Sequence, residues 1–469
     1  MVTGVIAEYN PFHKGHALQL AAARQAGGGP VVAIMSGNFV QRGEPAILSK
    51  GCRARMALSC GADLVVELPL PWAMSTAQNF AEGGVGLLAA LGCVEVLSFG
   101  SECGDAGLLA RAAAAIDHPD LKTDLDAGLA AGLPFAAARE QAVRRRFGPE
   151  TAALLRRPND TLAVEYLAAA ARLGASFTLL PVRRAGAPHD APLPGPFSVE
   201  QATASGKSKP SGTTGSPHRP PPAACSAPYN TAGFAGGQPS FDGAAAAQSE
   251  AGRQIAGSKS SLLPDGTDVP ALSASGIRRL MREGKWQEAF SHLPDAAVPI
   301  LQKELEQGGL VRPERLETAL LARLRCMSPA DFAALPDVSE GLENRLYAAA
   351  RQAVSLEGFY EAVKVKRYSL ARIRRIAFAA LLGLDKSHFR QPVPYIRVLG
   401  FTAEGLALLR QAAKQAALPL LLRAKDAAGL DRQGYDVFQS ECRADDLFWL
   451  AADRPRPCGT DFTDPVIRV

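Results

Sequence analysis

Residues 4–16 read GVIAEYNPFHKGH and place His13 and His16 around Gly15, directly after a short apolar run. A helical pattern, ALQL, follows at once, so the two histidines lie at the N-terminus of a predicted helix. Backbone N–H groups at a helix N-terminus attract anions, and a glycine lets a phosphate approach the chain closely. Two imidazoles would add donors that stabilise charge as pyrophosphate leaves. A lone histidine is more often an ordinary loop residue, but the pair in this context predicts a loop that binds the phosphates of ATP.

The first part of the chain alternates short apolar runs with helical patterns. This alternation predicts an α/β, Rossmann-like domain with a parallel, doubly wound sheet. The five apolar runs are residues 2–8, 31–37, 63–69, 94–100 and 176–182. Ligands of such sheets bind at the carboxyl ends of the strands. We therefore expect the loops after the first, second and fourth runs to converge on one crevice.

Four segments are predicted along the chain. Residues 1–190 form the ATP-binding catalytic domain. Residues 191–268 are rich in Pro, Gly, Ser and Ala, and this low-complexity insertion cannot bury enough apolar surface to offset its ordering entropy. Residues 269–390 have a helical pattern, and residues 391–469 form a small α/β segment that we expect to cap the helical part.

Composition bounds the classes of function. The chain has 469 residues, 47% of them hydrophobic, and a formal net charge of +5, which permits a polyanionic partner without indicating one. Its eight cysteines form no C-x-x-C pair, which is typical of reduced thiols in a cytoplasmic protein. No uncharged apolar run reaches about 18 residues, so no membrane span is predicted. The sequence shows no dedicated metal cage and gives no oligomeric state.

A basic segment, KVKRYSLARIRRI at residues 364–376, contains no acidic residue. Its cations could neutralise several phosphates of a nucleic acid, and its tyrosine could stack on a base. A solvated helix face is the alternative interpretation. The residues predicted to contact RNA are Lys364, Lys366, Arg367, Tyr368, Arg372, Arg374 and Arg375.

Several motifs together resemble the tRNA(Met) cytidine acetate ligase family of the nucleotidylyltransferase superfamily, which carries the H-x-G-H motif. The resemblance covers nearly the whole chain except the insertion. The stretches that carry it are GVIAEYNPFHKGH, MSGNFVQRGEPAILSK, FGSE at 99–102, RPNDTLAVEYL at 157–167, LSASGIRR at 272–279, VSEGLENRL at 338–346 and KRYSLARIRRI at 366–376. One departure is Asp160, where the family usually has a second asparagine.

The resemblance implies a two-step ligase. Acetate and ATP would form acetyl-adenylate with release of pyrophosphate, and the acetyl group would pass to the exocyclic amine of the wobble cytidine in elongator tRNA(Met). The catalytic residues would be His13 and His16, and Mg²⁺ would accompany the ATP.

The resemblance also implies which residues contact ATP. They are Ile6, Ala7, Glu8, Tyr9, Asn10, Pro11, Phe12, His13, Lys14, Gly15, His16, Ala17, Leu18 and Gln19, followed by Gly100, Asn159, Arg183 and Arg184. Further candidates for phosphate contacts lie on a predicted helix after residue 49 and in the S-A-S-G-I-R motif, although a solvated face and a plain helix cap explain them equally simply. These candidates are Lys50, Arg53, Ser273, Ser275 and Arg278.

Two other functions fit the same motifs. The first is a nucleotidylyltransferase that acts on a small phosphorylated metabolite, with the basic segment as ordinary surface. The second is a tRNA-binding protein whose nucleotide site has lost catalysis. Tight, salt-sensitive binding of tRNA would exclude the first, and acetate-dependent exchange of pyrophosphate into ATP would exclude the second.

Overall fold

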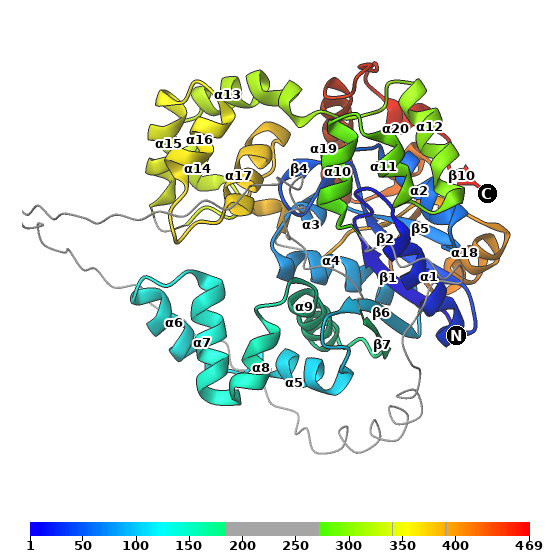
Figure 1. The fold of residues 1–469 in the computed structure, drawn as a ribbon, viewed down its shortest axis with the longest axis horizontal. Helices are drawn as coiled ribbons and strands as arrows, with labels where there is room; N and C mark the ends of the chain where they lie inside the picture. Colours follow the sequence, from blue (N-terminus) through cyan, green and yellow to red (C-terminus); the bar gives the residue numbers. More distant parts are fainter. Residues whose placement is uncertain (184–271, 340, 390–391) are drawn as a thin grey trace, which may run out of the picture. The chain divides into compact units, whose positions relative to one another are not determined.

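The computed structural model describes residues 1–183, 272–339, 341–389 and 392–469 (Figure 1). Arg184 and the insertion at 191–268 lie outside these residues, so what we predicted for them stays a prediction. The domain boundaries at 190 and 268 lie there as well.

A mainly parallel sheet forms the centre of the described chain, as predicted (Figure 1). The strands run in the order β5-β2-β1-β6-β7, and all four pairings between them are parallel. The chain order reverses at β1, so the crevice between β1 and β6 is the topological switch point, where doubly wound sheets bind ligands. The five strands are β1 (Thr3–Ala7), β2 (Val31–Ser36), β5 (Leu64–Leu68), β6 (Val96–Ser101) and β7 (Thr178–Arg183).

Helices cover both faces of this sheet, because successive strand residues point to opposite faces. Ile6 packs into one core with α4 and α9, whereas its neighbour Val5 packs into another with α1 and α2. The helices of this part are α1 (Lys14–Gly27), α2 (Lys50–Ser59), α3 (Leu70–Ala73), α4 (Ala77–Ala90), α5 (Ala106–Ile116), α6 (Leu121–Ala130), α7 (Phe135–Phe147), α8 (Pro149–Leu154) and α9 (Pro158–Arg172). A hairpin of β3 (Phe39–Val40) and β4 (Glu44–Pro45) follows β2.

The later part of the described chain is mainly helical, as predicted for residues 269–390. Its helices α13 to α17 share a core with Phe39, Leu70 and Met74 of the first part. None of the described helices is both long and apolar enough to span a membrane. The helices are α10 (Ala274–Arg282), α11 (Trp286–Ser291), α12 (Val298–Glu306), α13 (Glu317–Cys326), α14 (Pro329–Ala334), α15 (Leu342–Gln352), α16 (Leu356–Val363), α17 (Leu370–Leu382), α18 (Ala403–Gln415), α19 (Arg432–Leu450) and α20 (Thr460–Thr463).

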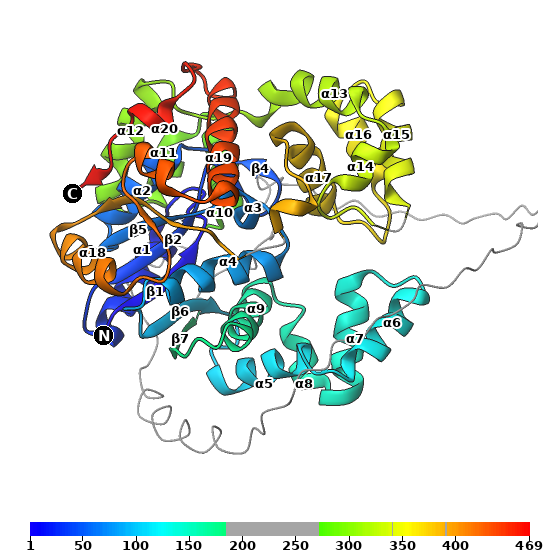
Figure 2. The ribbon, with the colours of Figure 1, turned by 180° about the vertical axis from the view of Figure 1, so that it is seen from behind.

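The C-terminal segment corrects one expectation, because it extends the main sheet and does not simply cap the helical part. Its strand β8 (Ile396–Phe401) pairs antiparallel with β5, and β9 (Leu420–Leu421) and β10 (Ile467–Arg468) pair with β8. These strands cover the open edge of β5, which would otherwise leave backbone groups unpaired. In the view from behind, α19 lies next to α3, which it contacts (Figure 2).

Candidate functional site

The histidine loop, residues 8–16, leads from β1 into α1. His13 caps the helix: its Nδ1 accepts a hydrogen bond from the N–H of Gly15 at 3.0 Å. The Nδ1 of His16 accepts from the N–H of His13 at 3.3 Å, and the two rings stack with centroids 3.8 Å apart. A neutral imidazole that accepts at Nδ1 carries its hydrogen on Nε2. The loop therefore fixes both histidines as Nε2–H donors at the end of β1.

The structure gives a steric reason for the glycine at position 15, which the sequence did not reveal. A Cβ atom at this position would lie 2.9 Å from Cε1 of His13, closer than a side chain tolerates. The glycine therefore makes room for the capping imidazole as well as for any ligand.

Two polar side chains, of which Asn10 is buried and Glu8 partly buried, anchor the histidine loop to the segment that follows β2. A carboxylate oxygen of Glu8 accepts from the N–H of Gln41 at 2.9 Å, and Oδ1 of Asn10 accepts from the N–H of Ile47 at 2.8 Å. Burial raises the pKa of Glu8. We left open whether Glu8 orients a histidine or serves as a structural partner, and these contacts favour the structural role.

Arg53 is a second anchor, and its placement corrects a prediction. We expected it on a helix face that could reach phosphates, but it is fully buried, and burial lowers its pKa to about 10. Its guanidinium donates to four backbone carbonyls and so joins the ends of β1 and β2 to the start of α2. The acceptors are the carbonyl oxygens of Leu48, Glu8, Ser36 and Gly37.

The S-A-S-G-I-R motif reaches the histidine loop across the sequence. Ser273 caps α10 by accepting from the N–H of Gly276. Arg278, one turn later, donates to the carbonyl of Asn10 at 2.7 Å and to Oγ of Ser275 at 3.2 Å. The structure therefore brings this arginine to the loop that we predicted to bind phosphates.

The turn at residues 41–44 touches both the nucleotide side and the basic helix α17. Glu44 lies 3.4 Å from the guanidinium of Arg278 and 3.9 Å from that of Arg374. Gly43 has φ +73°, and a Cβ there would lie 2.3 Å from the backbone nitrogen of Arg375. The turn therefore packs directly on the backbone of α17.

The FGSE and RPND motifs bind each other at the far side of the switch point. Glu102 accepts from Nδ2 of Asn159 at 2.6 Å and from the N–H of Asp160 at 2.8 Å, which caps α9. In return, Oδ1 of Asp160 accepts from the hydroxyl of Ser101 and from two backbone N–H groups. Glu102 is a site residue that we missed, although a carboxylate at a strand end facing a Pro-Asn-Asp helix start was a usable signal. The departure at Asp160 thus has a structural role.

Gly100 and Arg183 lie at the carboxyl ends of neighbouring strands. In the parallel ladder of β6 and β7, Gly100 is opposite Val182 and Ser101 is opposite Arg183. These residues therefore lie at the same carboxyl edge of the sheet as the histidine loop, and their contact with ATP stays a prediction.

Lys50 corrects a second prediction. We expected it on a solvated face or near phosphates, but its Nζ is buried among three carboxylates, Glu67 at 3.0 Å, Asp445 at 2.6 Å and Asp461 at 2.8 Å. Those carboxylates raise its pKa. Because its donors are used within the protein, Lys50 is placed as a structural cation and not as a phosphate ligand.

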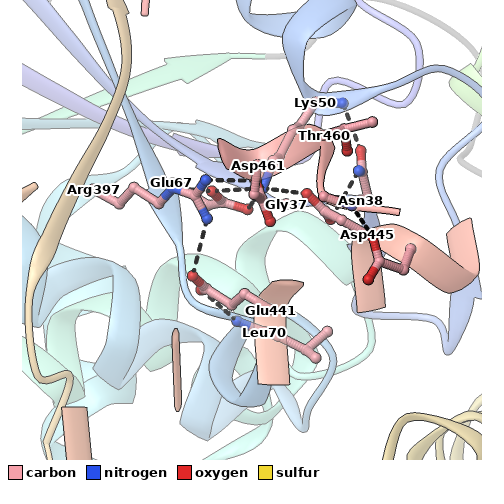
Figure 3. Close-up of polar contacts among 12 residues, drawn as sticks. Gly37, Asn38, Lys50, Glu67, Leu70, Arg397, Glu441, Asp445, Thr460 and Asp461 are labelled. Atoms are coloured by element: carbon pink, nitrogen blue, oxygen red, sulfur yellow. Dashed lines mark hydrogen bonds and ion pairs between the residues drawn. The ribbon is translucent and has the colours of Figure 1, made fainter. Parts of the chain in front are cut away.

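Lys50 belongs to a buried charge cluster that joins the sheet to the C-terminal segment (Figure 3). Arg397 of β8 contacts Glu67, Glu441 and Asp461 at 3.4, 3.4 and 2.5 Å. Burial raises the pKa of Glu441 to about 7, and burial together with the charge of Asp461 raises that of Asp445. The cluster consists of Lys50, Arg397, Glu67, Glu441, Asp445 and Asp461.

Comparison with known proteins decides the family. The chain matches the family model described as HIGH Nucleotidyl Transferase over residues 1–205 and 253–460. It is 32% identical to the tRNA(Met) cytidine acetate ligase of Thermoanaerobacter pseudethanolicus, with 100% of both chains covered. The chain belongs to the tRNA(Met) cytidine acetate ligase family.

Other members of this family agree in sequence and in fold. The chain is 33% identical to the tRNA(Met) cytidine acetate ligase of Thermotoga petrophila, over 88% of this chain and 85% of that one. It superposes with a TM-score of 0.78, at 30% identity, on the crystal structure of Thermotoga maritima TmcAL bound with alpha-thio ATP, covering 100% and 99% of the two chains. The predicted family and fold class are confirmed.

The basic segment of this family member differs from our prediction. We expected Tyr368 to stack on a base, but its ring is buried and the guanidinium of Arg372 lies over it at 5.0 Å. Arg372 also donates to the carbonyl of Asp337, and Arg375 pairs with the Asp337 carboxylate at 2.6 Å. Tyr368 is therefore not an available stacking surface, and Arg372 and Arg375 are partly used within the protein.

The cations that face solvent precede the helix. α17 begins at Leu370, and residues 365–368 form a tight turn closed by a hydrogen bond from the N–H of Tyr368 to the carbonyl of Val365. Lys364, Lys366 and Arg367 on this turn are exposed. These three residues are the best-placed candidates for contacts with phosphates.

Proposed function

We propose that the chain is an ATP-dependent acetate ligase that acetylates the exocyclic amine of the wobble cytidine in elongator tRNA(Met). The observation that carries the proposal is the stacked pair His13 and His16, held as Nε2–H donors beside the switch point. The names of the curated relatives and the ATP analogue bound by the Thermotoga maritima protein support it.

In the first step an acetate oxygen attacks the α-phosphorus of ATP, and the bond to pyrophosphate breaks. Negative charge grows on the phosphate oxygens, and preorganised donors at these oxygens lower the barrier. His13 and His16 supply such donors, and Arg278 adds positive charge beside the same loop. Gly100, Asn159 and Arg183 would complete the nucleotide site, together with Arg184.

In the second step the cytidine amine attacks the carbonyl carbon of acetyl-adenylate, AMP leaves and the amine loses a proton. Magnesium would arrive as the complex with ATP, the substrate form of a triphosphate. Among the described residues, no group of three or more His, Cys, Asp or Glu side chains is suited to hold a metal ion.

RNA would bind through the exposed cations of the turn at 364–367. Contacts of this kind neutralise phosphates and position the RNA without reading its sequence. A cytoplasmic location and the partner tRNA belong to the same proposal.

The test is incubation of the protein with ATP, labelled acetate and unmodified elongator tRNA(Met), followed by nuclease digestion. We expect labelled acetylcytidine at the wobble position. Acetate-dependent exchange of pyrophosphate into ATP, measured without RNA, reports the first step alone. Pyrophosphate exchange without labelled RNA would support the adenylation step and would reject this RNA as the acceptor. Absence of exchange would reject the ligase mechanism.

A further inference from the structure

A cavity of about 150 Å³ lies between the start of α4 and the helical part of the chain. Asn79 contributes to it from α4, Arg375 from α17, and Lys386 and Phe389 from the short 3-10 helix η4 (Lys386–Phe389). Met74 adds a buried apolar wall. The nucleotide site described above does not use this cavity.

The cavity opens near the same edge of the sheet as the histidine loop. A Cβ on Gly84 of α4 would lie 2.8 Å from Cδ1 of Ile6, so α4 and β1 touch at this level. In a crossover between parallel strands the helix starts at the carboxyl edge. Asn79 lies five residues before Gly84, about 7.5 Å further toward that edge at 1.5 Å per residue. The cavity therefore lies on the side of the sheet from which an acceptor would reach the adenylate.

Two cations of the cavity keep donors for a ligand. Arg375 uses Nε for Asp337 at 2.6 Å and reaches the carbonyl of Gln41 with Nη1 at 3.5 Å, whereas Nη2 has no hydrogen bond to any described residue. Lys386 donates one hydrogen bond, to the carbonyl of Ala333, and its side chain is exposed. One carboxylate, that of Asp337, opposes the two cations, so a single positive charge remains for an anionic ligand.

Asp337, which binds Arg375, has an unusual backbone conformation. Asp337 has φ +61°, a left-handed conformation that is uncommon outside glycine and is found often at functional sites. Its carboxylate binds Arg375 and its carbonyl accepts from Arg372.

The size and walls of the cavity fit one aromatic ring. A protein cavity of about 150 Å³ accommodates a benzene molecule. Phe389 is half-buried and offers an aromatic surface, and the amide of Asn79 makes no hydrogen bond to a described residue, so its donor and acceptor can meet the edge of a base. A planar ring, a hydrogen-bonding edge and a phosphate together are the chemistry of a nucleotide.

We propose that this cavity binds one unpaired nucleotide of the RNA, with its base against Phe389 and its phosphate at Lys386 and Arg375. The proposal rests on the proposed function, since it names how the same RNA is held. It also predicts a preference for RNA that contains a loop, because a base within a duplex is not available to a pocket.

The test compares two labelled RNAs, the anticodon stem-loop of tRNA(Met) and a fully paired duplex made from its stem. For Phe389→Leu we expect about tenfold weaker binding of the stem-loop and unchanged binding of the duplex, because the variant removes the aromatic ring on which a base would stack. Phe389→Tyr keeps the ring and should restore binding. Asn79→Ala should weaken binding of the stem-loop and leave binding of the duplex unchanged. Exchange of pyrophosphate into ATP should stay unchanged in all three variants.

Two results would overturn the proposal. If Phe389→Leu loses affinity for both RNAs equally, the cavity makes only ordinary phosphate contacts. If Phe389→Leu binds the stem-loop as tightly as wild type, no base enters the cavity. If the wild type forms no acetylcytidine but Phe389→Leu still selectively weakens the stem-loop, the cavity stands and the proposed function fails. The two failures are therefore distinguishable.

Discussion

The histidine loop and the buried charge cluster both gather polar side chains beside the sheet, but they are built in opposite ways. The loop brings together residues that are neighbours in the chain, His13 and His16, and a helix start orients them. The cluster joins Lys50 to Asp445 and Asp461, about four hundred residues later in the sequence. The comparison indicates that the histidines grouped in sequence are placed for chemistry, whereas the charges of the cluster, which only the fold brings together, stabilise the structure. Four predictions test this division.

The largest effect should come from Lys50→Met. Removing this cation leaves four buried carboxylates with Arg397 alone, and the loss of one partner of a buried ion pair costs about 3–5 kcal/mol of the free energy of unfolding. Urea denaturation measures it, with the exposed Lys122→Met as the matched control. A loss no larger than that of the control would contradict a structural role, and so would selective loss of ATP binding in the folded variant.

The next effect should come from His16→Ala, which removes a donor and one long hydrogen bond within the loop but leaves the anchors at Glu8, Asn10 and Arg53 in place. Loss of one preorganised donor lowers kcat by about 10²–10³. We expect pyrophosphate exchange to fall by that factor while the melting temperature stays close to that of wild type. His118→Ala changes a half-exposed histidine and should leave exchange intact. If His16→Ala were destabilised as much as Lys50→Met, the result would contradict the distinction between the histidine loop and the buried charge cluster.

A smaller effect should appear in the pH dependence of stability. Because the pKa of Glu441 is raised from 4.5 to about 7, its contribution to folding is fully present below pH 4.5 and is lost as pH rises through about 7. Glu441→Gln resembles the protonated form, so its free energy of unfolding should rise relative to wild type across this window, by about 3 kcal/mol. The exposed Glu150→Gln should show no such trend, and a pH-independent difference for Glu441→Gln would refute the assignment.

The smallest effect should come from Lys366→Ala on the exposed turn. A single phosphate contact should weaken tRNA binding only severalfold and lower the slope of log affinity against log salt by about 1. Binding titrations at several salt concentrations measure the slope, with Lys425→Ala as an exposed control on another segment. An unchanged slope would remove this turn from the RNA surface.

The sequence predicted what depends on local patterns. The five parallel strands follow from short apolar runs, and the H-x-G-H pair is legible because its members lie three residues apart. The helix cap at Ser273, which we gave as the alternative to a phosphate contact, was legible for the same reason, since its partner Gly276 is three residues away.

The remaining features depend on distant partners. No pattern in SKGCRARM tells that Arg53 and Lys50 point inward, because their acceptors come from other segments. Likewise, the apolar run that forms β8 could cap a helical domain or extend a sheet, and only the edge of β5 decides between them. Tyr368 among arginines suggested a stacking surface, yet the ring completes a core instead.

The turn at 41–44 has a consequence for how the two substrates influence each other. Glu44 contacts Arg278 beside the histidine loop and lies near Arg374 on α17, and Gly43 leaves no slack between the turn and that helix. A nucleotide whose phosphates attract Arg278 would weaken the ion pair between Arg278 and Glu44. The electrostatic attraction between Glu44 and Arg374 would then change as well. Binding free energies are reciprocal, so if a bound nucleotide changes the affinity for RNA through this turn, RNA changes the affinity for the nucleotide by the same factor. Through the four residues of this turn, binding of the acceptor RNA would thus alter the affinity for ATP before any ATP is consumed.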